Sequence, residues 1–302
     1  MISVVVPVYN SENSLTELTE RIYSTLSGNH DFEILYIDDG SSDSSWKTIE
    51  KLVSTYPKIR GFKLGRNFGQ HNALLCGIRE AKGSIIVTLD DDLQHSPESI
   101  PKLIEKLSQG FDVVYASPKQ PAHSFARTFA SKLTKYALQK TMGNEIVAQT
   151  SAFRAFNSEV RFAFENYNEP LVNIDVLLSW ATTRFASIIV NHDARQYGSS
   201  GYTIFSLIRH ALNMMTGFST RPLKFASMIG ILFSLVGIAL LIFVLIRWVI
   251  EGSIVQGFAF IASAVCMFSG AQLVALGIIG EYISRIHLRT MKKPSYIIKD
   301  RL

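Results

Sequence analysis

The most constraining feature of this chain is a long apolar stretch near its C-terminal end. The 22 residues between Lys224 and Arg247 carry no charged side chain, and about 20 apolar residues suffice to cross the hydrocarbon core of a bilayer. A second stretch, 252–280, is likewise uncharged and mostly apolar. A buried core helix would explain one such stretch alone, but two in tandem favour a transmembrane hairpin, with helices at 225–250 and 254–283.

The charges that flank these stretches predict the orientation of the hairpin. Arg221 and Lys224 precede the first stretch, and Arg285 and Arg289 stand among the cations that follow the second. Cytoplasmic flanks of membrane spans are enriched in Lys and Arg. We therefore expect a multi-pass protein of the cytoplasmic (inner) membrane, with the N-terminal part and a basic tail, 284–302, both facing the cytoplasm.

Composition excludes several other classes of protein. The net charge is +5, yet the sequence has no compact Lys/Arg run and no zinc or helix-turn-helix signature, so we expect no nucleic-acid partner. The two cysteines, Cys76 and Cys266, lack metal-ligand spacing and do not suggest a disulfide framework. The N-terminus has neither a basic region nor a cleavage site, so it does not resemble a signal peptide.

The first part of the chain alternates between short apolar runs and amphipathic stretches. Strands are expected at 2–9, 32–37, 61–64, 84–89, 112–116 and 188–192, and helices at 12–27, 44–56, 70–81 and 97–109. Nearly all-apolar strands that alternate with helices predict a Rossmann-like, mostly parallel sheet covered on both faces. We expect this α/β domain to span 1–200.

Two further segments combine cations with apolar residues. They are 125–142 and 203–218, the second within a juxtamembrane region at 201–224. Basic amphipathic helices commonly lie on membrane surfaces, although a plain surface helix would explain the first segment equally well. We expect these helices to bring the domain against the bilayer.

Acidic residues stand at the ends of two predicted strands. Asp38 and Asp39 follow one strand, and the three aspartates at 90–92 follow another. In a parallel sheet, ligands bind at the carboxyl ends of strands. Crowded carboxylates repel one another unless a cation neutralises them, and such oxygen ligands suit Mg²⁺ or Mn²⁺. Three aspartates in a loop can also be a solvated turn or a helix cap, but their place on the sheet favours a metal site.

Four motifs, taken in order, carry a resemblance to a known family. They are V-V-V-P-V-Y-N at 4–10, I-D-D-G-S-S-D at 37–43, R-N-F-G-Q-H at 66–71 and L-D-D-D-L-Q at 89–94. The chain resembles the family 2 glycosyltransferases with a GT-A fold, and within them the bacterial polyprenyl-phosphate sugar transferases and dolichol-phosphate mannose synthase. The resemblance covers essentially the whole chain. It implies transfer of a sugar from a nucleotide-sugar donor to a polyprenyl phosphate.

The resemblance also implies roles for individual residues. The nucleoside pocket would be lined by Pro7, Tyr9, Asn10 and Asp39. The metal-binding positions would be Asp90, Asp92 and Gln94, and the expected catalytic residues are Asp90, Asp92 and Arg154. Asp39 would hydrogen-bond the base, and Asp91 occupies a slot that is often Ala and receives no role. Arg66 would contact the nucleotide or else be a surface arginine.

Two motifs depart from the family pattern. In A-Q-T-S-A-F-R at 148–154, Ala148 replaces the leading Asp of D-x-T-x-x-F-R, and in R-Q-Y-G-S-S-G-Y at 195–202, Gly201 replaces a frequent Lys. A phosphate monoester has a second pKa of about 6, so a polyprenyl phosphate nucleophile needs positioning more than deprotonation. The candidates to hold that phosphate, each also readable as a surface cation, are Arg127, Lys132, Arg154 and Arg195.

The expected reaction is a single displacement that inverts the anomeric centre, with a UDP-hexose donor and undecaprenyl phosphate as family-level expectations. One alternative is a processive polysaccharide synthase, whose Q-x-x-R-W motif is not matched at Arg247-Trp248. Another is a catalytically inactive nucleotide-sugar-binding membrane scaffold, which Ala148 and Gly201 keep open. Small residues in the second span permit close helix packing and suggest a homo-oligomer; they are Gly257, Ala262, Ser263, Ala264, Gly270 and Ala271.

Overall fold

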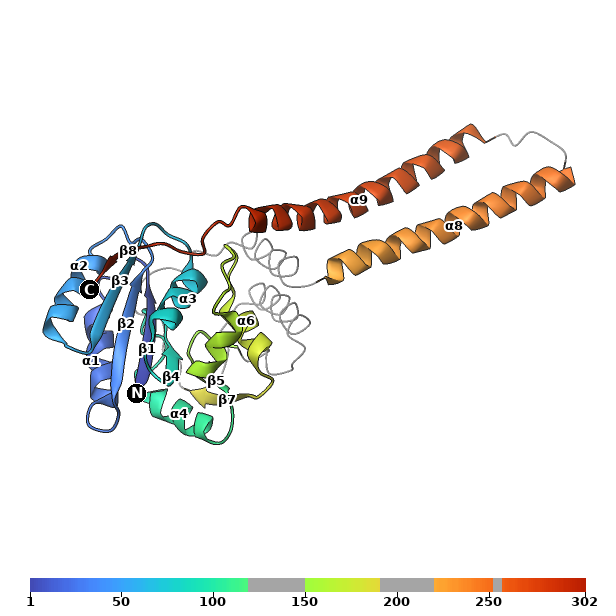
Figure 1. Ribbon diagram of the computed structural model, residues 1–302. Coiled ribbons are helices and arrows are strands. Elements are labelled where there is room, and N and C mark those ends of the chain that lie inside the picture. Colours follow the sequence, from blue (N-terminus) through green and yellow to red (C-terminus); the bar gives the residue numbers. More distant parts are fainter. Residues whose placement is uncertain (119–149, 191–219, 252–256) are drawn as a thin grey trace. The chain divides into compact units, whose positions relative to one another are not determined.

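The computed structural model describes residues 1–118, 150–190, 220–251 and 257–302 (Figure 1). The chain divides into two compact units, Met1–Arg209 together with Lys292–Leu302, and His210–Met291. The amphipathic segments expected at 125–142 and 203–218 lie outside the described residues. So do three of the expected phosphate-binding cations, Arg127, Lys132 and Arg195.

A mixed sheet of eight strands forms the centre of the first unit, in the order β7-β5-β6-β4-β1-β2-β3-β8. The strands are β1 (Ile2–Val8), β2 (Phe32–Asp38), β3 (Ile59–Leu64), β4 (Ile85–Thr88), β5 (Val113–Pro118), β6 (Arg154–Asn157), β7 (Phe185–Val190) and β8 (Ile298–Arg301). β1, β2, β3 and β4 run parallel, as do β5 and β7. β6 and β8 are antiparallel to their neighbours. The expected mostly parallel sheet is confirmed.

Helices cover both faces of this sheet. They are α1 (Leu15–Leu26), α2 (Ser45–Thr55), α3 (Gln70–Glu80), the 3₁₀ turn η1 (Pro97–Ser99), α4 (Ile100–Ser108), the 3₁₀ segment η3 (Ser158–Phe164) and α6 (Ile174–Ala181). The strands and helices predicted for 2–116 are present, with ends that differ by at most three residues. The late strand predicted at 188–192 begins earlier, at Phe185. β6, η3, α6 and β8 were not predicted from the sequence.

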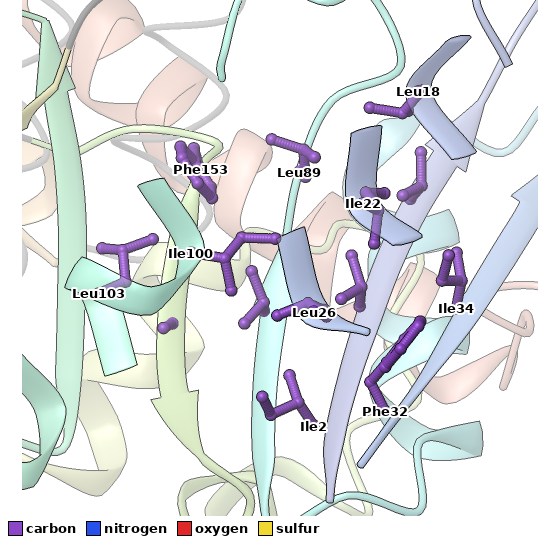
Figure 2. Packing of buried hydrophobic residues seen from close by; sticks show 14 of the residues in the cluster. Ile2, Leu18, Ile22, Leu26, Phe32, Ile34, Leu89, Ile100, Leu103 and Phe153 are labelled. Carbon is purple, nitrogen blue, oxygen red and sulfur yellow. The ribbon is translucent and has the colours of Figure 1, made fainter. Parts of the chain in front are cut away.

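The side chains of β1 explain why both faces are covered. Val4, Val6 and Val8 belong to one buried cluster, which includes residues of α1, α2 and α4. Val5 belongs to a second cluster on the opposite face, with residues of α3 and α6. Successive residues of a strand point to opposite faces, so an all-apolar strand needs a helical layer on each side. Figure 2 shows Leu18, Ile22 and Leu26 of α1 packed over the strands of the first cluster.

The last residues of the chain correct one expectation. We expected 284–302 to be a basic tail, but 298–301 forms β8 and completes the sheet beside β3. Gly61 and Leu302 exchange backbone hydrogen bonds of 3.2 and 2.9 Å. The strand escaped detection because it is a largely exposed edge strand, and its residues, I-K-D-R, show no apolar alternation.

The second unit contains two long apolar helices, α8 (Arg221–Glu251) and α9 (Phe258–Thr290). Within them, 221–246 and 267–290 are long and apolar enough to cross a membrane, and neither apolar window is buried inside the structure. The rings of Phe233 and Phe268 meet edge to face, with centroids 5.8 Å apart. Two candidate membrane helices therefore follow the sheet domain, as the apolar stretches predicted.

Candidate active site

A cavity of about 680 Å³ opens at the carboxyl ends of β1, β2 and β4. Its volume lies within the range of about 300–1,000 Å³ that is usual for small-molecule sites. Its lining consists of Pro7, Val8, Tyr9, Asn10, Ser11, Asn13, Ser14, Asp39, Asn67, Gly69, Gln70, Asp90, Asp91 and Asp92. Six of the residues assigned to the donor or the metal therefore meet in one place, far apart as they are in the sequence.

Two buried leucines hold the aspartate loop that follows β4. Leu89 is 0% exposed and Leu93 is 1% exposed, and they bracket the three aspartates. Leu93 has a φ of 59°, a left-handed conformation that is uncommon for a leucine. Its burial fixes this turn, so the carboxylates between the two leucines are presented to the cavity by a loop anchored at both ends.

Asp90 is the most strongly perturbed carboxyl of this loop. Burial, followed by the neighbouring charges of Asp92 and Asp91, raises the pKa of Asp90 to about 7, while Arg154 and a hydrogen bond from Gln70 oppose the rise. The Gln70 Nε2 donates to Asp90 Oδ1 across 2.6 Å. An ionised carboxylate in this position is therefore disfavoured until a cation approaches it.

The carboxylates suit a divalent cation only in combination with a ligand. Within the described residues, no group of three or more His, Cys, Asp or Glu side chains is arranged to hold a metal ion. Asp90 and Asp92 line the cavity, whereas Gln94 does not; its backbone N–H donates to Asp92 Oδ1 at 3.2 Å. Mg²⁺ commonly takes one or two protein carboxylates and completes its shell with substrate phosphates and water. Asp90 and Asp92 fit that pattern.

Asp39 organises the opposite wall of the cavity. Its two carboxylate oxygens accept hydrogen bonds from the backbone N–H groups of Phe68 (2.7 Å) and Gly69 (2.8 Å). Burial raises the pKa of Asp39 above its usual value. Arg66 is exposed and does not line the cavity; its guanidinium lies 4.5 Å from the centre of the Phe68 ring. The nucleotide contact expected of Arg66 stays a prediction.

Arg154 is not among the residues that line the cavity. The strand register places it opposite Thr88 of β4 and Tyr115 of β5, and it is 2% exposed. Its guanidinium forms an ion pair with Asp175 of α6, and the Tyr115 hydroxyl donates to the same carboxylate oxygen at 2.9 Å. In the described residues the guanidinium is therefore paired with a buried carboxylate, and binding of the acceptor phosphate by Arg154 stays a prediction.

Several residues near the site were not assigned a role from the sequence. Gln70, Asn67 and Gly69 belong to the motif at 66–71, so the motif could have indicated that they line the cavity. Asp91, which received no role, lines the cavity and accepts a hydrogen bond from the Tyr9 N–H at 3.2 Å. Asp175 had no comparable signal, because nothing local marks its pairing with Arg154 across 21 residues.

The family model for glycosyl transferase family 2 matches residues 3–162, which is more than half of the chain and includes the cavity-lining residues. The chain belongs to glycosyltransferase family 2. As a member of that family it is a glycosyltransferase, and the mixed sheet described above is its GT-A domain.

Relatives of this glycosyltransferase match over nearly its whole length. It is 34% identical to the undecaprenyl-phosphate 4-deoxy-4-formamido-L-arabinose transferase of Proteus mirabilis, across 99% of this chain and 93% of the relative. It is 36% identical to the protein of the same name from Klebsiella pneumoniae strain 342, across 99% and 92%. These relatives, by name, act on undecaprenyl phosphate.

Solved structures share the fold at low sequence identity. Glucosyl-3-phosphoglycerate synthase from Mycobacterium tuberculosis, in complex with Mn²⁺, UDP and glucosyl-3-phosphoglycerate, superposes with a TM-score of 0.54. It is 17% identical, and the match covers 72% of this chain and 77% of that chain. A second structure of that enzyme, with Mn²⁺, UDP-glucose and phosphoglyceric acid, gives a TM-score of 0.53. At this identity the likeness supports the GT-A fold alone.

Proposed function

We propose that this glycosyltransferase transfers a sugar from a nucleotide-sugar to undecaprenyl phosphate at the cytoplasmic face of the inner membrane. The observation that carries the proposal is the cavity, which gathers the carboxylates of Asp39, Asp90 and Asp92 at the carboxyl ends of parallel strands. The relatives named for undecaprenyl phosphate and the two apolar helices support the lipid acceptor.

The donor nucleotide would occupy the cavity between two walls. We assign the nucleoside to the wall formed by Pro7, Tyr9, Asn10 and Asp39, and the diphosphate to the side of Asp90 and Asp92. Among the described residues, the lining of the cavity contains no Lys or Arg. A divalent cation would offset the repulsion between the diphosphate and the aspartates beside it. Mg²⁺ or Mn²⁺ held by Asp90 and Asp92 would also stabilise the departing nucleoside diphosphate as a Lewis acid.

The proposed reaction is a single displacement. An oxygen of the acceptor phosphate forms a bond to the anomeric carbon, while the bond from that carbon to the donor's diphosphate oxygen breaks. The anomeric configuration inverts, so an α-linked donor gives a β-linked lipid product. A phosphate monoester with a second pKa of about 6 is largely dianionic near neutral pH. The protein therefore has to position the nucleophile and compensate its charge rather than take up a proton from it.

The path of the chain supports the proposed topology. The first unit contains the N-terminal residues and also Lys292–Leu302, which follow both apolar helices. If the two helices cross the membrane, both of their outer ends must lie on the side of the sheet domain, since β8 pairs with β3. The cations that flank the spans favour the cytoplasm as that side.

The donor sugar is the least constrained part of the proposal. A UDP-hexose is the expectation from the family, whereas the relatives are named for 4-deoxy-4-formamido-L-arabinose. Hydrogen-bond acceptors and donors of the cavity, such as Asn13 and Asn67, would contact the nucleotide or the sugar in either case.

We also propose a homo-oligomer, because small residues in the second span permit close packing of helices. Light scattering of the detergent-solubilised protein tests this proposal, and a monomer would contradict it.

The decisive experiment is a transfer assay with the purified full-length protein. Radiolabelled nucleotide-sugars, including UDP-hexoses and a nucleotide-linked 4-deoxy-4-formamido-L-arabinose, are incubated with undecaprenyl phosphate and either Mg²⁺ or Mn²⁺. Transfer of label to the organic phase from one donor, abolished by EDTA, is the expected result. Folded protein that binds a nucleotide-sugar and transfers nothing from any donor would favour the inactive scaffold instead.

A further inference from the structure

Asp91 contacts the loop that follows β1. Its Oδ2 accepts the backbone N–H of Tyr9 at 3.2 Å, which joins residues 82 positions apart. In the same loop, the Ser11 hydroxyl donates to the Tyr9 carbonyl at 3.2 Å. Asp91 also lines the cavity. It therefore connects the loop after β4, which carries the proposed diphosphate site, to the loop after β1, which carries the proposed nucleoside site.

The loop after β1 has a second set of restraints at Asn10. Asn10 has a φ of 54°, in the left-handed region that asparagine adopts more readily than most residues. On its other side the loop is held by the β2–α2 turn. There, Asn10 N–H donates to Ser41 Oγ at 3.0 Å, and Asn10 Oδ1 accepts from Ser42 N–H at 2.8 Å.

Tyr9 lies between these two sets of restraints. It is 50% exposed and lines the cavity, so its ring is presented to a ligand rather than to the core. An exposed ring gives a stacking surface to a nucleobase only if the backbone that carries it is held in place. The turn 41–42 holds Asn10, and Asp91 holds the backbone nitrogen of Tyr9 itself.

We propose that Asp91 is a positioning residue of the donor site, which fixes the backbone of Tyr9 so that the loop after β1 is preorganised for the nucleoside. This inference rests on the proposed function, because it takes the cavity to be a nucleotide site. It assigns to Asp91 a role that differs from the metal binding proposed for Asp90 and Asp92. In this role Asp91 acts by accepting a hydrogen bond, and its negative charge is not needed.

Two substitutions separate these properties. Asp91→Asn keeps a side-chain oxygen that can accept the Tyr9 N–H, and Asp91→Ala removes it. Glu98→Gln serves as the matched control, since Glu98 also links α1 to the segment after β4, through Arg21 at 2.9 Å, but does not line the cavity. All variants are made in the full-length protein and compared by melting temperature before any assay.

Calorimetry with UDP and GDP in the presence of Mn²⁺ is the first measurement, and steady-state kinetics with the active donor is the second. We expect Asp91→Ala to weaken nucleotide binding and to raise the KM for the donor by about tenfold, with kcat within about threefold of the parent. Asp91→Asn and Glu98→Gln should stay close to the parent in both measurements. A general loss of folding would not produce this division between KM and kcat, nor the rescue by Asn.

Two other outcomes would overturn the inference. If Asp91→Asn weakens nucleotide binding as much as Asp91→Ala, and both need more Mn²⁺, then Asp91 acts through its charge as a metal ligand. If Asp91→Ala binds nucleotide as tightly as the parent, the restraint on Tyr9 is irrelevant to the donor. A parent protein that binds neither nucleotide, although folded, would instead refute the proposed function, and these results are distinguishable.

Discussion

The side-chain amide nitrogen of Gln70 lies 2.6 Å from Oδ1 of Asp90, so the first residue of α3 donates a hydrogen bond to the first aspartate after β4. Asp39 fixes the two residues that precede Gln70, because its carboxylate accepts hydrogen bonds from the N–H groups of Phe68 and Gly69. One short stretch of chain therefore connects the proposed base-binding carboxylate to the proposed metal-binding carboxylate.

Gln70 should consequently orient Asp90 for the metal. A hydrogen bond to a charged group contributes about 1.5–3 kcal/mol, so Gln70→Ala should lower kcat/KM for the donor by roughly 10- to 100-fold. The melting temperature should change little, because Gln70 is exposed. Asn72→Ala is the comparison for a structural effect, since Asn72 lies two residues further along α3 and its side-chain amide donates to the Phe68 and Pro170 carbonyls. Unchanged kinetics in Gln70→Ala would show that the bond is incidental.

Asp92→Asn removes one proposed metal-binding carboxylate with almost no change of volume. Loss of several kcal/mol of leaving-group stabilisation should reduce turnover by at least about 100-fold. The transfer assay at a range of Mn²⁺ concentrations measures this effect, and the Glu98→Gln variant controls for loss of a surface carboxylate. A variant that retains full transfer would remove Asp92 from the mechanism.

The raised pKa of Asp90 predicts how stability depends on pH. Asp90 titrates near pH 7 when folded, against an ordinary value of 3.8, so between these values the folded state binds more protons than the unfolded state. Its contribution to the free energy of unfolding is therefore greatest below about pH 4 and is lost as the pH rises through about 7. In EDTA, the melting temperature of the parent should fall more between pH 5 and pH 8 than the melting temperature of Asp90→Asn.

Metal should reverse this trend, because a divalent cation binds the ionised carboxylate. We expect Mn²⁺ to raise the melting temperature of the parent more at pH 8 than at pH 5.5, and to have little effect on Asp90→Asn at either pH. An equal stabilisation of parent and variant would place the metal elsewhere.

The buried pair of Arg154 and Asp175 predicts a stability effect rather than a change in lipid binding. Arg154→Met leaves the Asp175 carboxylate buried beside the Tyr115 hydroxyl, and breaking such a pair costs about 3–5 kcal/mol. The double variant Arg154→Met/Asp175→Leu should recover part of this loss, since both charges are then absent. Thermal unfolding measures the effect, and kinetics measure the KM for undecaprenyl phosphate, which should not change in Arg154→Lys. A raised KM for undecaprenyl phosphate in folded Arg154→Lys would support the phosphate contact that the sequence predicted.

The strand β8 predicts that the end of the chain is part of the catalytic domain. Truncation after Pro294 removes β8 and exposes the edge of β3, so we expect a lower melting temperature and aggregation of the solubilised protein. Arg301→Ala leaves the strand in place and removes the partly exposed ion pair with Glu80 and the contact with the Phe62 ring, each of which is worth about 1 kcal/mol or less. A truncated protein as stable as the parent would mean that β8 contributes nothing to the fold.

Much of the fold could be predicted because its signals are local. The all-apolar runs at 2–8 and 32–38 and the helical spacing of Leu15, Leu18 and Ile22 are properties of neighbouring residues. The order of the motifs is likewise a property of the sequence, and it pointed to the aspartates after β2 and β4. The carboxyl ends of parallel strands meet at one edge, so these residues could be expected to converge in a single cavity.

Other parts depend on pairing between distant segments. β6 enters the sheet antiparallel between β4 and β5, and this position turns Arg154 inward to meet Asp175. No spacing within 148–154 distinguishes an arginine that faces a phosphate from one that faces a buried carboxylate. The difference is made by the strand on each side and by the helix packed above.

The sequence by itself thus determined that the chain combines an α/β domain with two membrane-length helices, and which acidic residues end its strands. These properties follow from hydrophobic periodicity and length, which act within a few residues. Only the tertiary structure decided that Asp91 holds the backbone of Tyr9, that Gln70 donates to Asp90 and that 298–301 closes the sheet. The hydrogen bonds between Tyr9 and Asp91 and between Gly61 and Leu302 join distant parts of the chain and depend on the register of whole strands. Burial and backbone pairing are satisfied only when the complete sheet is assembled.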